Sequence, residues 1–212
     1  ISYGPGGGIY YSTGDTGKIE GDTIIHNRSY DKGGGLYYNT ENGCVIKNNV
    51  FKDNSPSGIY DYCSTNPGAV CQIISNEFVN NEKGIYYISG FQKTLLIEEN
   101  VFTQNGYGIF ICETGNPYDY LQITDNEVIN SAYAGLYVYR QSWLDTFKIN
   151  KNHTVDNSDR GIYFYNNSGG YENTFIDSNI IEGNFTTGDG GGIYVYGKGV
   201  KITGNKIFNN TC

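Results

Sequence analysis

The side chains of this chain that are suited to acid–base chemistry are mainly carboxylates, accompanied by only two histidines. Glycoside hydrolysis requires two carboxyl groups about 5 to 9.5 Å apart, whereas a lyase or an epimerase requires a base close to a cation or metal. The best carboxylate candidates for such roles are Asp61, Glu113, Asp119, Glu127 and Asp177. Whether they do chemistry depends on the elements that position them.

Two of these carboxylates have positions that predict their surroundings. Glu127 and His153 occupy equivalent sites in consecutive repeats, so we expect them to touch on the outer surface, as many surface pairs do. Asp61 takes the place that Val138 or Phe164 fills in other repeats, which points it into the core. A local bulge explains this placement as well as a catalytic role does.

The elements themselves follow from a repeat, because the tripeptide Gly-Ile/Leu-Tyr/Phe recurs eight times at intervals of 23 to 31 residues. The copies begin at Gly8, Gly35, Gly58, Gly84, Gly108, Gly135, Gly161 and Gly192. A period of this length is typical of a solenoid in which one repeat forms one turn. We therefore expect residues 1–212 to form a single domain with one continuous core.

A second pattern, Ile-x-x-Asn-x-apolar-x-x-Asn, follows each tripeptide and produces two rows of asparagine. Clear copies place these asparagines at Asn49 and Asn54, Asn76 and Asn81, Asn100 and Asn105, and Asn179 and Asn184. Short stretches of alternating apolar residues predict short strands, and asparagine tolerates left-handed backbone, so we expect each asparagine to form a corner. Three strands and three bends per repeat predict a parallel β-helix whose stacked asparagines bond to one another.

The Gly-Gly-x-Ile-Tyr and Phe-x-x-Asn motifs resemble the right-handed parallel β-helix repeats of the pectin-lyase-like superfamily. That superfamily includes carbohydrate-binding and sugar-hydrolase β-helices and the repeats of chlamydial polymorphic outer membrane proteins. The resemblance covers nearly the whole chain and implies an all-β fold, a single right-handed parallel β-helix of about eight three-strand rungs. It implies no single function, because lyases, hydrolases, epimerases, tailspikes and adhesins share the fold.

Within this superfamily, the chain lacks the sequence motifs of the known enzyme active sites, which argues against an enzyme. The chain has no Asn-x-Asp, Gly-His-Asp and Arg-Ile-Lys set like that of polygalacturonases, no Asp-Pro-His like that of alginate epimerases, and only three arginines. An enzyme of this fold would be a polysaccharide lyase or a glycoside hydrolase. Gly188-Asp189-Gly190 alone offers too few oxygen ligands for calcium, so we predict no metal and no cofactor.

If the isoleucine of each tripeptide points inward, its aromatic neighbour points outward, which makes this face the candidate binding surface. The candidate residues are Tyr60, Tyr86, Phe110, Tyr137, Tyr139, Tyr163, Tyr165, Tyr194, Tyr196 and Trp143. Trp143, the single tryptophan, lies in an enlarged loop near Arg140 and Asp145. The aromatic rows are explained equally by rings that stabilise one another and by a surface for sugars or for another protein.

Cysteines and glycosylation motifs suggest an oxidising, extracellular location. Cys44 and Cys71 share a position in consecutive repeats, which is within disulfide range, and Cys63 is an alternative partner for Cys71. Among several Asn-x-Ser/Thr motifs, Asn166 and Asn209 are the glycosylation candidates. We therefore expect an extracellular or cell-surface protein.

Charge and hydropathy exclude two classes of partner. The chain carries 14 Lys and Arg against 22 Asp and Glu, a net charge of −8, with its basic residues scattered singly. This distribution lacks the basic patch of a nucleic-acid binder. No stretch approaches the roughly 20 apolar residues that span a bilayer, so neither nucleic acid nor membrane insertion is expected.

The repeats run from the first residues to the last without a visible cap sequence. Exposed strand edges at the ends of a solenoid favour association, so we predict a structural, self-assembling or adhesive protein that stacks head to tail or binds other surface proteins. The alternative to stacking is that flanking rungs belong to a longer surface protein. The alternative function is a carbohydrate-binding or polysaccharide-processing β-helix that uses the tyrosine face.

Overall fold

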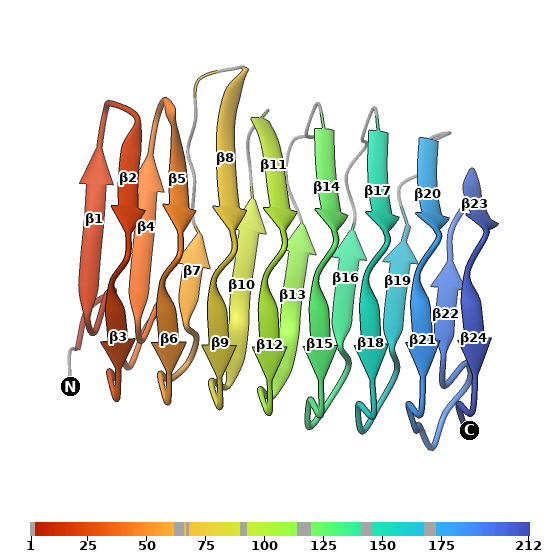
Figure 1. Ribbon diagram of the computed structural model, residues 1–212. Helices are drawn as coiled ribbons and strands as arrows, with labels where there is room; N and C mark the ends of the chain where they lie inside the picture. Colours follow the sequence, from red (N-terminus) through yellow and green to blue (C-terminus); the bar gives the residue numbers. More distant parts are fainter. Residues whose placement is uncertain are drawn as a thin grey trace.

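The computed structural model describes residues 3–61, 66, 68–89, 93–113, 120–140, 146–167 and 173–212, without the side chains of Ser89, Lys93 and Glu113. The described chain winds as a right-handed parallel β-solenoid built from three sheets of eight strands each. The strands follow one another rung by rung from the N-terminal to the C-terminal end (Figure 1). The predicted fold class and architecture are confirmed.

The first sheet contains the Gly-Ile-Tyr strands. Its members are β1 (Ile9–Thr13), β4 (Leu36–Thr40), β7 (Ile59–Asp61), β10 (Lys83–Ser89), β13 (Tyr107–Glu113), β16 (Leu136–Arg140), β19 (Ile162–Asn166) and β22 (Ile193–Tyr196). The second sheet holds β2 (Gly17–Glu20), β5 (Gly43–Lys47), β8 (Ala69–Ile74), β11 (Lys93–Glu98), β14 (Tyr120–Thr124), β17 (Thr146–Asn150), β20 (Asn173–Asp177) and β23 (Val200–Thr203).

The third sheet consists of three-residue strands that lie between the two asparagine rows. Its members are β3 (Thr23–Ile25), β6 (Val50–Lys52), β9 (Glu77–Val79), β12 (Val101–Thr103), β15 (Glu127–Ile129), β18 (His153–Val155), β21 (Ile180–Glu182) and β24 (Lys206–Phe208). Every pairing is parallel and in register, so each side chain lies over its equivalent in the next rung.

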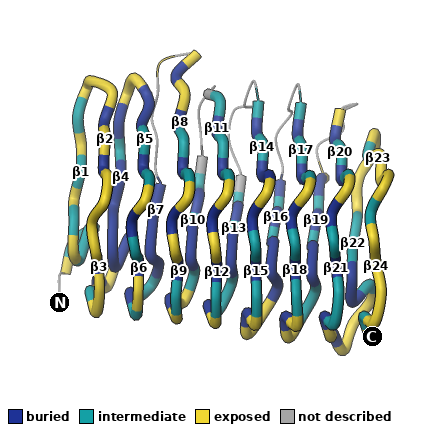
Figure 2. Tube along the Cα trace, in the orientation of Figure 1, coloured by how far each residue is buried: buried dark blue, intermediate teal, exposed yellow. Residues whose placement is uncertain are grey.

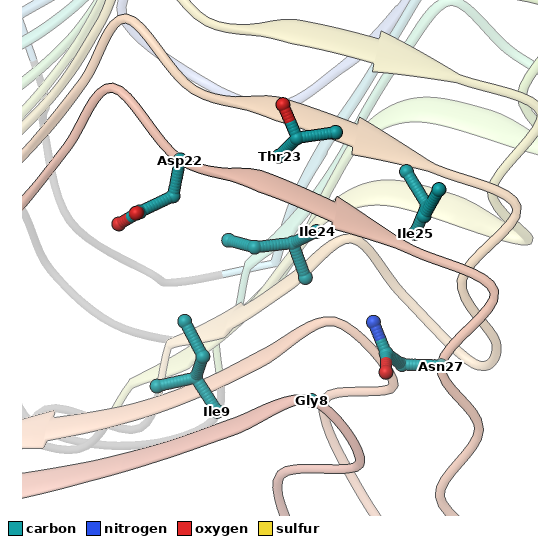
Figure 3. A pocket seen from close by; sticks show the side chains of 7 residues that line it. All are labelled: Gly8, Ile9, Asp22, Thr23, Ile24, Ile25 and Asn27. Atoms are coloured by element: carbon teal, nitrogen blue, oxygen red, sulfur yellow. The ribbon is translucent and has the colours of Figure 1, made fainter.

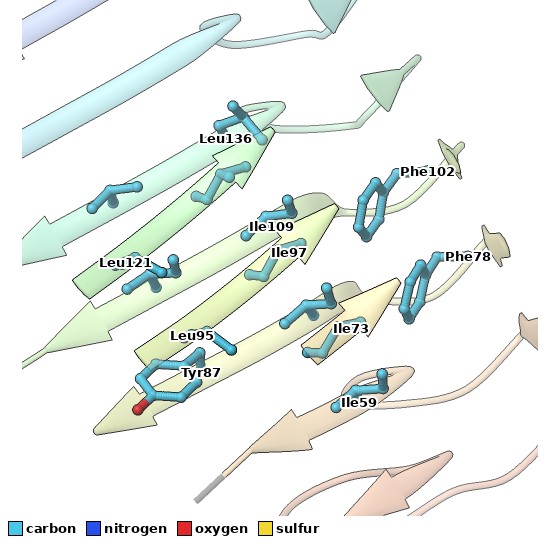
Figure 4. Close-up of a cluster of buried hydrophobic side chains, with 14 of the residues drawn as sticks. Ile59, Ile73, Phe78, Tyr87, Leu95, Ile97, Phe102, Ile109, Leu121 and Leu136 are labelled. Atoms are coloured by element: carbon cyan, nitrogen blue, oxygen red, sulfur yellow. The ribbon is translucent and has the colours of Figure 1, made fainter. Parts of the chain in front are cut away.

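The core is made of files of like residues. Ile73, Ile97 and Ile123 follow one another on the second sheet and are fully buried, as are Phe51, Phe78 and Phe102 on the third. The ring centroids of Phe78 and Phe102 are 4.6 Å apart and their planes are nearly parallel (Figure 4). Burial is complete in the middle rungs and partial at both ends (Figure 2).

The asparagine rows form two buried hydrogen-bond ladders with a fixed direction. The backbone N–H and side-chain amide of Asn126 both donate to Oδ1 of Asn152, at 3.1 and 3.0 Å, and the amide also donates to the carbonyl of Ile97 at 2.8 Å. Asn100 makes the same two bonds to Oδ1 of Asn126. The bonds from one asparagine to the next thus all run toward the C-terminal end, and Ser131 interrupts the second ladder where it takes the place of an asparagine.

The prediction that the ladder asparagines themselves adopt left-handed backbone is wrong. The residue immediately before each ladder position takes the positive φ, for example Glu99 (54°), Asp125 (53°) and Lys151 (57°). In the described chain all non-glycine residues with positive φ lie at these corners. The left-handed residue at the corner changes the direction of the chain and turns the following asparagine inward. The hydrogen bonds of that asparagine offset the cost of about 1 to 2 kcal/mol for left-handed backbone in a non-glycine residue.

Truncating one ladder amide is expected to destabilise the protein strongly. In Asn126→Ala, the N–H and amide of Asn100 and the carbonyl of Ile97 lose buried partners, which predicts a loss of about 3 kcal/mol or more in the free energy of unfolding. Urea denaturation measures it. Asn130→Gly, at an exposed corner with φ of 54°, is the control, and we expect a change within about 1 kcal/mol. Equal losses in both variants would contradict the ladder's role.

Candidate functional site

The tyrosine face lies on the outside of the first sheet, as predicted, and its rings stack on one another. The first tyrosine row is Tyr10, Tyr37, Tyr60, Tyr86, Phe110, Tyr137, Tyr163 and Tyr194, in register across eight rungs. The second tyrosine row is Tyr139, Tyr165 and Tyr196. Centroids are 4.7 Å apart for Tyr137 and Tyr163 and 4.7 Å for Tyr165 and Tyr196.

Stacking determines which part of each ring reaches solvent. Phe110, Tyr137 and Tyr163 are nearly parallel, with interplanar angles of 6°, so their faces cover each other and only their edges are left for contact with solvent. Arg160 lies 5.3 and 5.1 Å from the rings of Tyr163 and Tyr194. The rows therefore stabilise the first sheet through ring and cation contacts, and present hydroxyl groups at their outer edge.

The expected exposure fails at the second and third positions of the first row, which are buried. Tyr60 is 1% exposed and Tyr37 is 8% exposed. Lys32 lies 5.5 Å from the Tyr60 ring centroid, and the rings of Tyr37 and Tyr86 flank it, the latter edge-on at 5.0 Å. Tyr60 is therefore closed to a ligand, whereas Tyr10 in the first rung is 57% exposed and Tyr196 in the last rung is 50% exposed.

Burial raises the pKa of Tyr137 from its ordinary value of 10.0 to about 12, with smaller contributions from Tyr163 and Tyr107. Because the folded protein favours the neutral phenol, its stabilising effect is complete below pH 10 and is lost as the pH rises through about 12. We expect tyrosine absorbance and urea denaturation to show this loss, and Tyr137→Phe to weaken the pH dependence. Identical pH dependence in both proteins would contradict it.

The carboxylate candidates do not converge on one site. Asp61 is 1% exposed and points inward as predicted, in register between Tyr38 and Tyr87. Asp177 lies on the second sheet, where Thr203 and Ser178 donate hydrogen bonds of 2.7 and 3.0 Å to its two oxygens. These bonds lower the pKa of Asp177. Asp119 and the side chain of Glu113 lie outside the described residues.

The predicted contact of Glu127 with His153 is confirmed, and a third residue joins it. Nδ1 of His153 lies 3.9 Å from Glu127, while Nε2 lies 2.8 Å from Glu182 one rung further on. The repeat pattern did not indicate Glu182, because Glu182 belongs to the neighbouring outer row of the third sheet. The three groups are partly exposed and lie at both imidazole nitrogens, so they form a chain of polar contacts on the surface.

The structure corrects the cysteine and loop predictions. Cys44 and Cys71 are stacked, buried and in register, but no disulfide joins them to each other. Arg140 is the buried last residue of β16, 5.8 Å from the ring centroid of Phe147, rather than an exposed loop residue. Trp143, Asp145 and Cys63 lie outside the described residues.

The two glycosylation candidates differ in exposure. Asn166 ends β19 and is 3% exposed, which leaves no room for a glycan at its amide. Asn209 is exposed at a corner of the last rung. Its use remains a prediction.

A hollow of about 350 Å³ lies on the outer face of the second sheet, in the last three rungs. It is lined by Lys148, Asn150, Phe175, Asp177 and Thr203. Of these residues the sequence pattern singled out only Asp177, although the strands place all five in two adjacent outward rows.

A second hollow, of about 360 Å³, lies at the N-terminal end of the solenoid (Figure 3). Its lining comprises Gly8, Ile9, Asp22, Thr23, Ile24, Ile25 and Asn27. The side chains of Ile9 and Ile24 there belong to the core files. At the opposite end Ile202 and Ile207 are each 49% exposed, whereas Ile176 and Ile181 in the preceding rung are fully buried.

Among the described residues, no helix is long and apolar enough to cross a membrane. Neither curated proteins nor solved structures yield a match to the chain. A family model described as "Periplasmic copper-binding protein (NosD)" matches residues 2–147. This match is consistent with a secreted or cell-envelope location. With its β-solenoid fold and more than half its length matched, the chain belongs to the NosD family.

Proposed function

We propose that this protein is a structural building block, outside the cytoplasm, that stacks end to end with further copies of itself. The observation that carries the proposal is the direction of the asparagine ladders. At the C-terminal end the backbone N–H groups of Asn205 and Asn210 have no acceptor within the described structure. At the N-terminal end the side-chain oxygens of Asp22 and Asn27 accept no hydrogen bond there.

The two ends match in register as well as in hydrogen bonding. If Asn205 of one copy donates to Asp22 of the next, Asn210 falls opposite Asn27, because both pairs are separated by five residues. The same register sets Ile202 against Ile19 and Ile207 against Ile24, which continues the core files. It also sets Tyr194 against Tyr10, which continues the first tyrosine row.

Burial supplies the driving force for this contact. Ile202 and Ile207 are half exposed and Phe208 is 43% exposed, and covering such side chains contributes about 1 kcal/mol or more each. One contact opposes the stacking, because Lys201 of one copy would face Lys18 of the next. Glu20 reduces this repulsion, since it already pairs with Lys18 and with Lys47 one rung up. A heterologous contact of this kind does not close, so it produces a filament.

We expect the 212-residue chain to form concentration-dependent rods of increasing length in sedimentation velocity and electron microscopy. Ile207→Lys places a charge in the contact and should weaken association at least about tenfold. Val101→Lys, at an exposed outer position, is the matched control and should assemble normally. The Ile207→Lys variant retains an unmodified N-terminal end, so it can bind the C-terminal end of a rod but cannot bind the next copy. Adding this variant to the unmodified chain should therefore shorten the rods. Single rods at every concentration, or equal loss in the control, would contradict the proposal.

Among the described residues, no cluster of side chains fits the copper in the family description. Copper is held by imidazole, thiolate and thioether ligands. The chain has no methionine, and its two histidines lie in different rungs, His26 at the first and His153 in β18. Cys44 and Cys71 are buried in the core. Among the described residues no group of three or more His, Cys, Asp or Glu side chains is placed to hold a metal ion.

A second candidate function is binding of a glycan at the tyrosine face. It is favoured by the position of the two tyrosine rows side by side on β16, β19 and β22, where ring edges and hydroxyl groups face outward. Burial raises the pKa of Tyr163 and Tyr165, so these hydroxyl groups remain protonated and able to donate. The same surface is also suited to a protein partner.

A glycan array that includes acidic polysaccharides tests this second function. Tyr163→Ala and Tyr137→Ala should weaken binding about tenfold by removing a ring and its hydroxyl, whereas Tyr30→Ala, exposed outside both rows, should bind normally. Lost binding with intact assembly supports the glycan function. Absence of binding to every glycan, or equal binding by all variants, contradicts it.

A further inference from the structure

The first asparagine ladder begins with a residue that is not an asparagine. Asp22 takes the first position, and the positions that follow it are Asn49, Asn76, Asn100, Asn126, Asn152, Asn179 and Asn205. In the proposed stacking, Asp22 meets Asn205 of the preceding copy. An ionised carboxylate only accepts hydrogen bonds, whereas an asparagine amide also donates two. The contact between copies is therefore the place where the donor pattern of the first ladder changes.

The second ladder shows the bond that an amide makes at this end of the solenoid. The backbone N–H and the side-chain amide of Asn27 both donate to Oδ1 of Asn54, at 3.0 and 3.1 Å. The backbone N–H of Asp22 makes the corresponding bond to Oδ1 of Asn49, at 2.9 Å. An ionised Asp22 side chain has no hydrogen for the second bond. Because Asp22 is exposed at the free end, water can solvate both of its oxygens there.

Stacking would replace that water with acceptors. Within the ladder, the amide of Asn49 also donates to the carbonyl of Ile19 in the preceding rung, at 3.1 Å. The same register sets one carboxylate oxygen of Asp22 against the carbonyl of Ile202 of the preceding copy. This oxygen would then face two acceptors, that carbonyl and Oδ1 of Asn49. An ionised oxygen in this place repels both, whereas a protonated one donates to either.

Burial acts in the same direction. The ladder residues Asn49, Asn76 and Asn100 are at most 2% exposed, and a further rung would cover Asp22 as it covers them. Complete burial favours the neutral form of a carboxyl group by up to about 3 to 5 pH units. The N–H and amide of Asn205 would donate to the other oxygen of Asp22. They bond the carbonyl oxygen of a neutral carboxyl group as well, so they offset only part of this preference.

The charged side chains nearest Asp22 in a stacked filament occupy outward rows that reach solvent. They are Lys18, Glu20 and Lys47 on its own copy, and Lys201 and Lys206 on the preceding copy. Solvent screens such charges, so the lysines reduce the preference for a neutral carboxyl group without removing it. Hydrogen bonds from Lys18 and Lys47 lower the pKa of Glu20, so Glu20 stays ionised. His26 lies at the other corner of the rung, 3.5 Å from Asp53.

We propose, on the basis of the stacking proposed above, that Asp22 makes the head-to-tail contact dependent on a proton. The carboxylate of Asp22 takes up one proton from solvent when two copies stack. The resulting hydroxyl group donates to the carbonyl of Ile202 or to Oδ1 of Asn49. The proton returns to solvent when the copies separate, so filament growth is favoured by acid.

The sign of the pH dependence follows from this proton. The stacked state binds one proton more than the separate copies, so the association constant rises by up to about tenfold for each unit by which the pH falls. The rise ends near about pH 4, where an ordinary aspartate in water is itself protonated.

Sedimentation velocity of the 212-residue chain between about pH 8 and about pH 5, at fixed ionic strength, measures this dependence. We expect the association constant to rise at least about tenfold over the range. Calorimetry in buffers of different ionisation enthalpy should show about one proton taken up per contact. Asp22→Asn completes the ladder, so it should assemble at pH 8 at least as strongly as the unmodified chain does at pH 5, without the pH dependence.

Two further variants are the controls. His26→Gln removes the nearest side chain of a type that titrates close to neutral pH, and it should leave the pH dependence unchanged. Asn27→Asp moves a second carboxyl group to the equivalent position of the other ladder. It should weaken assembly at pH 8 and raise the proton uptake toward two per contact. The melting temperature of each variant shows that the fold is kept.

The outcomes separate this inference from the stacking itself. Rods that form equally well at pH 8 and pH 5, or a pH dependence that persists in Asp22→Asn, would overturn the role of Asp22 and leave the stacking intact. Assembly that weakens in acid and in added salt would also overturn it, because an ionised Asp22 would then pair with Lys206. Single rods for every variant at every pH would contradict the stacking and this inference together.

Discussion

The structure depends on buried amide groups that are satisfied by the same group in the next rung together with backbone carbonyls. A corner residue with left-handed backbone turns each ladder asparagine inward, where its side chain would be costly if it lacked partners. The N–H and amide of one rung find the Oδ1 of the following rung. A rung is therefore stable only beside another rung, and the ladders give the solenoid a chemical direction that runs from its first rung to its last.

That dependence orders the surface as well as the core. Because each rung fixes the register of the next, outward side chains form rows, and equivalent residues meet at the spacing of parallel strands. On the first sheet the rows are tyrosines, whose stacked rings stabilise the sheet while their hydroxyl groups face outward. On the second sheet the rows are mixed, and the hollow forms where Lys148 and Phe175 run beside Asn150 and Asp177. One scaffold thus offers two chemically different faces.

Much of the candidate site could be predicted because the repeat determines which residues occupy equivalent positions in each rung and which side of the strand they face. The inward position of Asp61, the outward tyrosines and the contact of Glu127 with His153 all follow from counting along equivalent strands. Counting did not reveal Glu182, because it lies in the adjacent outer row and reaches His153 by a diagonal contact. Nor did it reveal the burial of Tyr60, which depends on Lys32 and on the edge-on ring of Tyr86. The position of a residue in the repeat determines whether its side chain points inward or outward, whereas its burial depends on the side chains around it.

By itself the sequence determined that this protein is a one-dimensional stack of three-strand rungs with isoleucine, phenylalanine and asparagine files inside, because the period of the pattern is the period of the fold. Only the tertiary structure decided that the residue before each asparagine bears the left-handed backbone, that Cys44 and Cys71 stack without a disulfide between them, and that Arg140 is buried. It also decided that Asn150 keeps an unpartnered oxygen beside a fixed carboxylate. These features depend on which side chains meet across rungs, and that is set by packing in three dimensions.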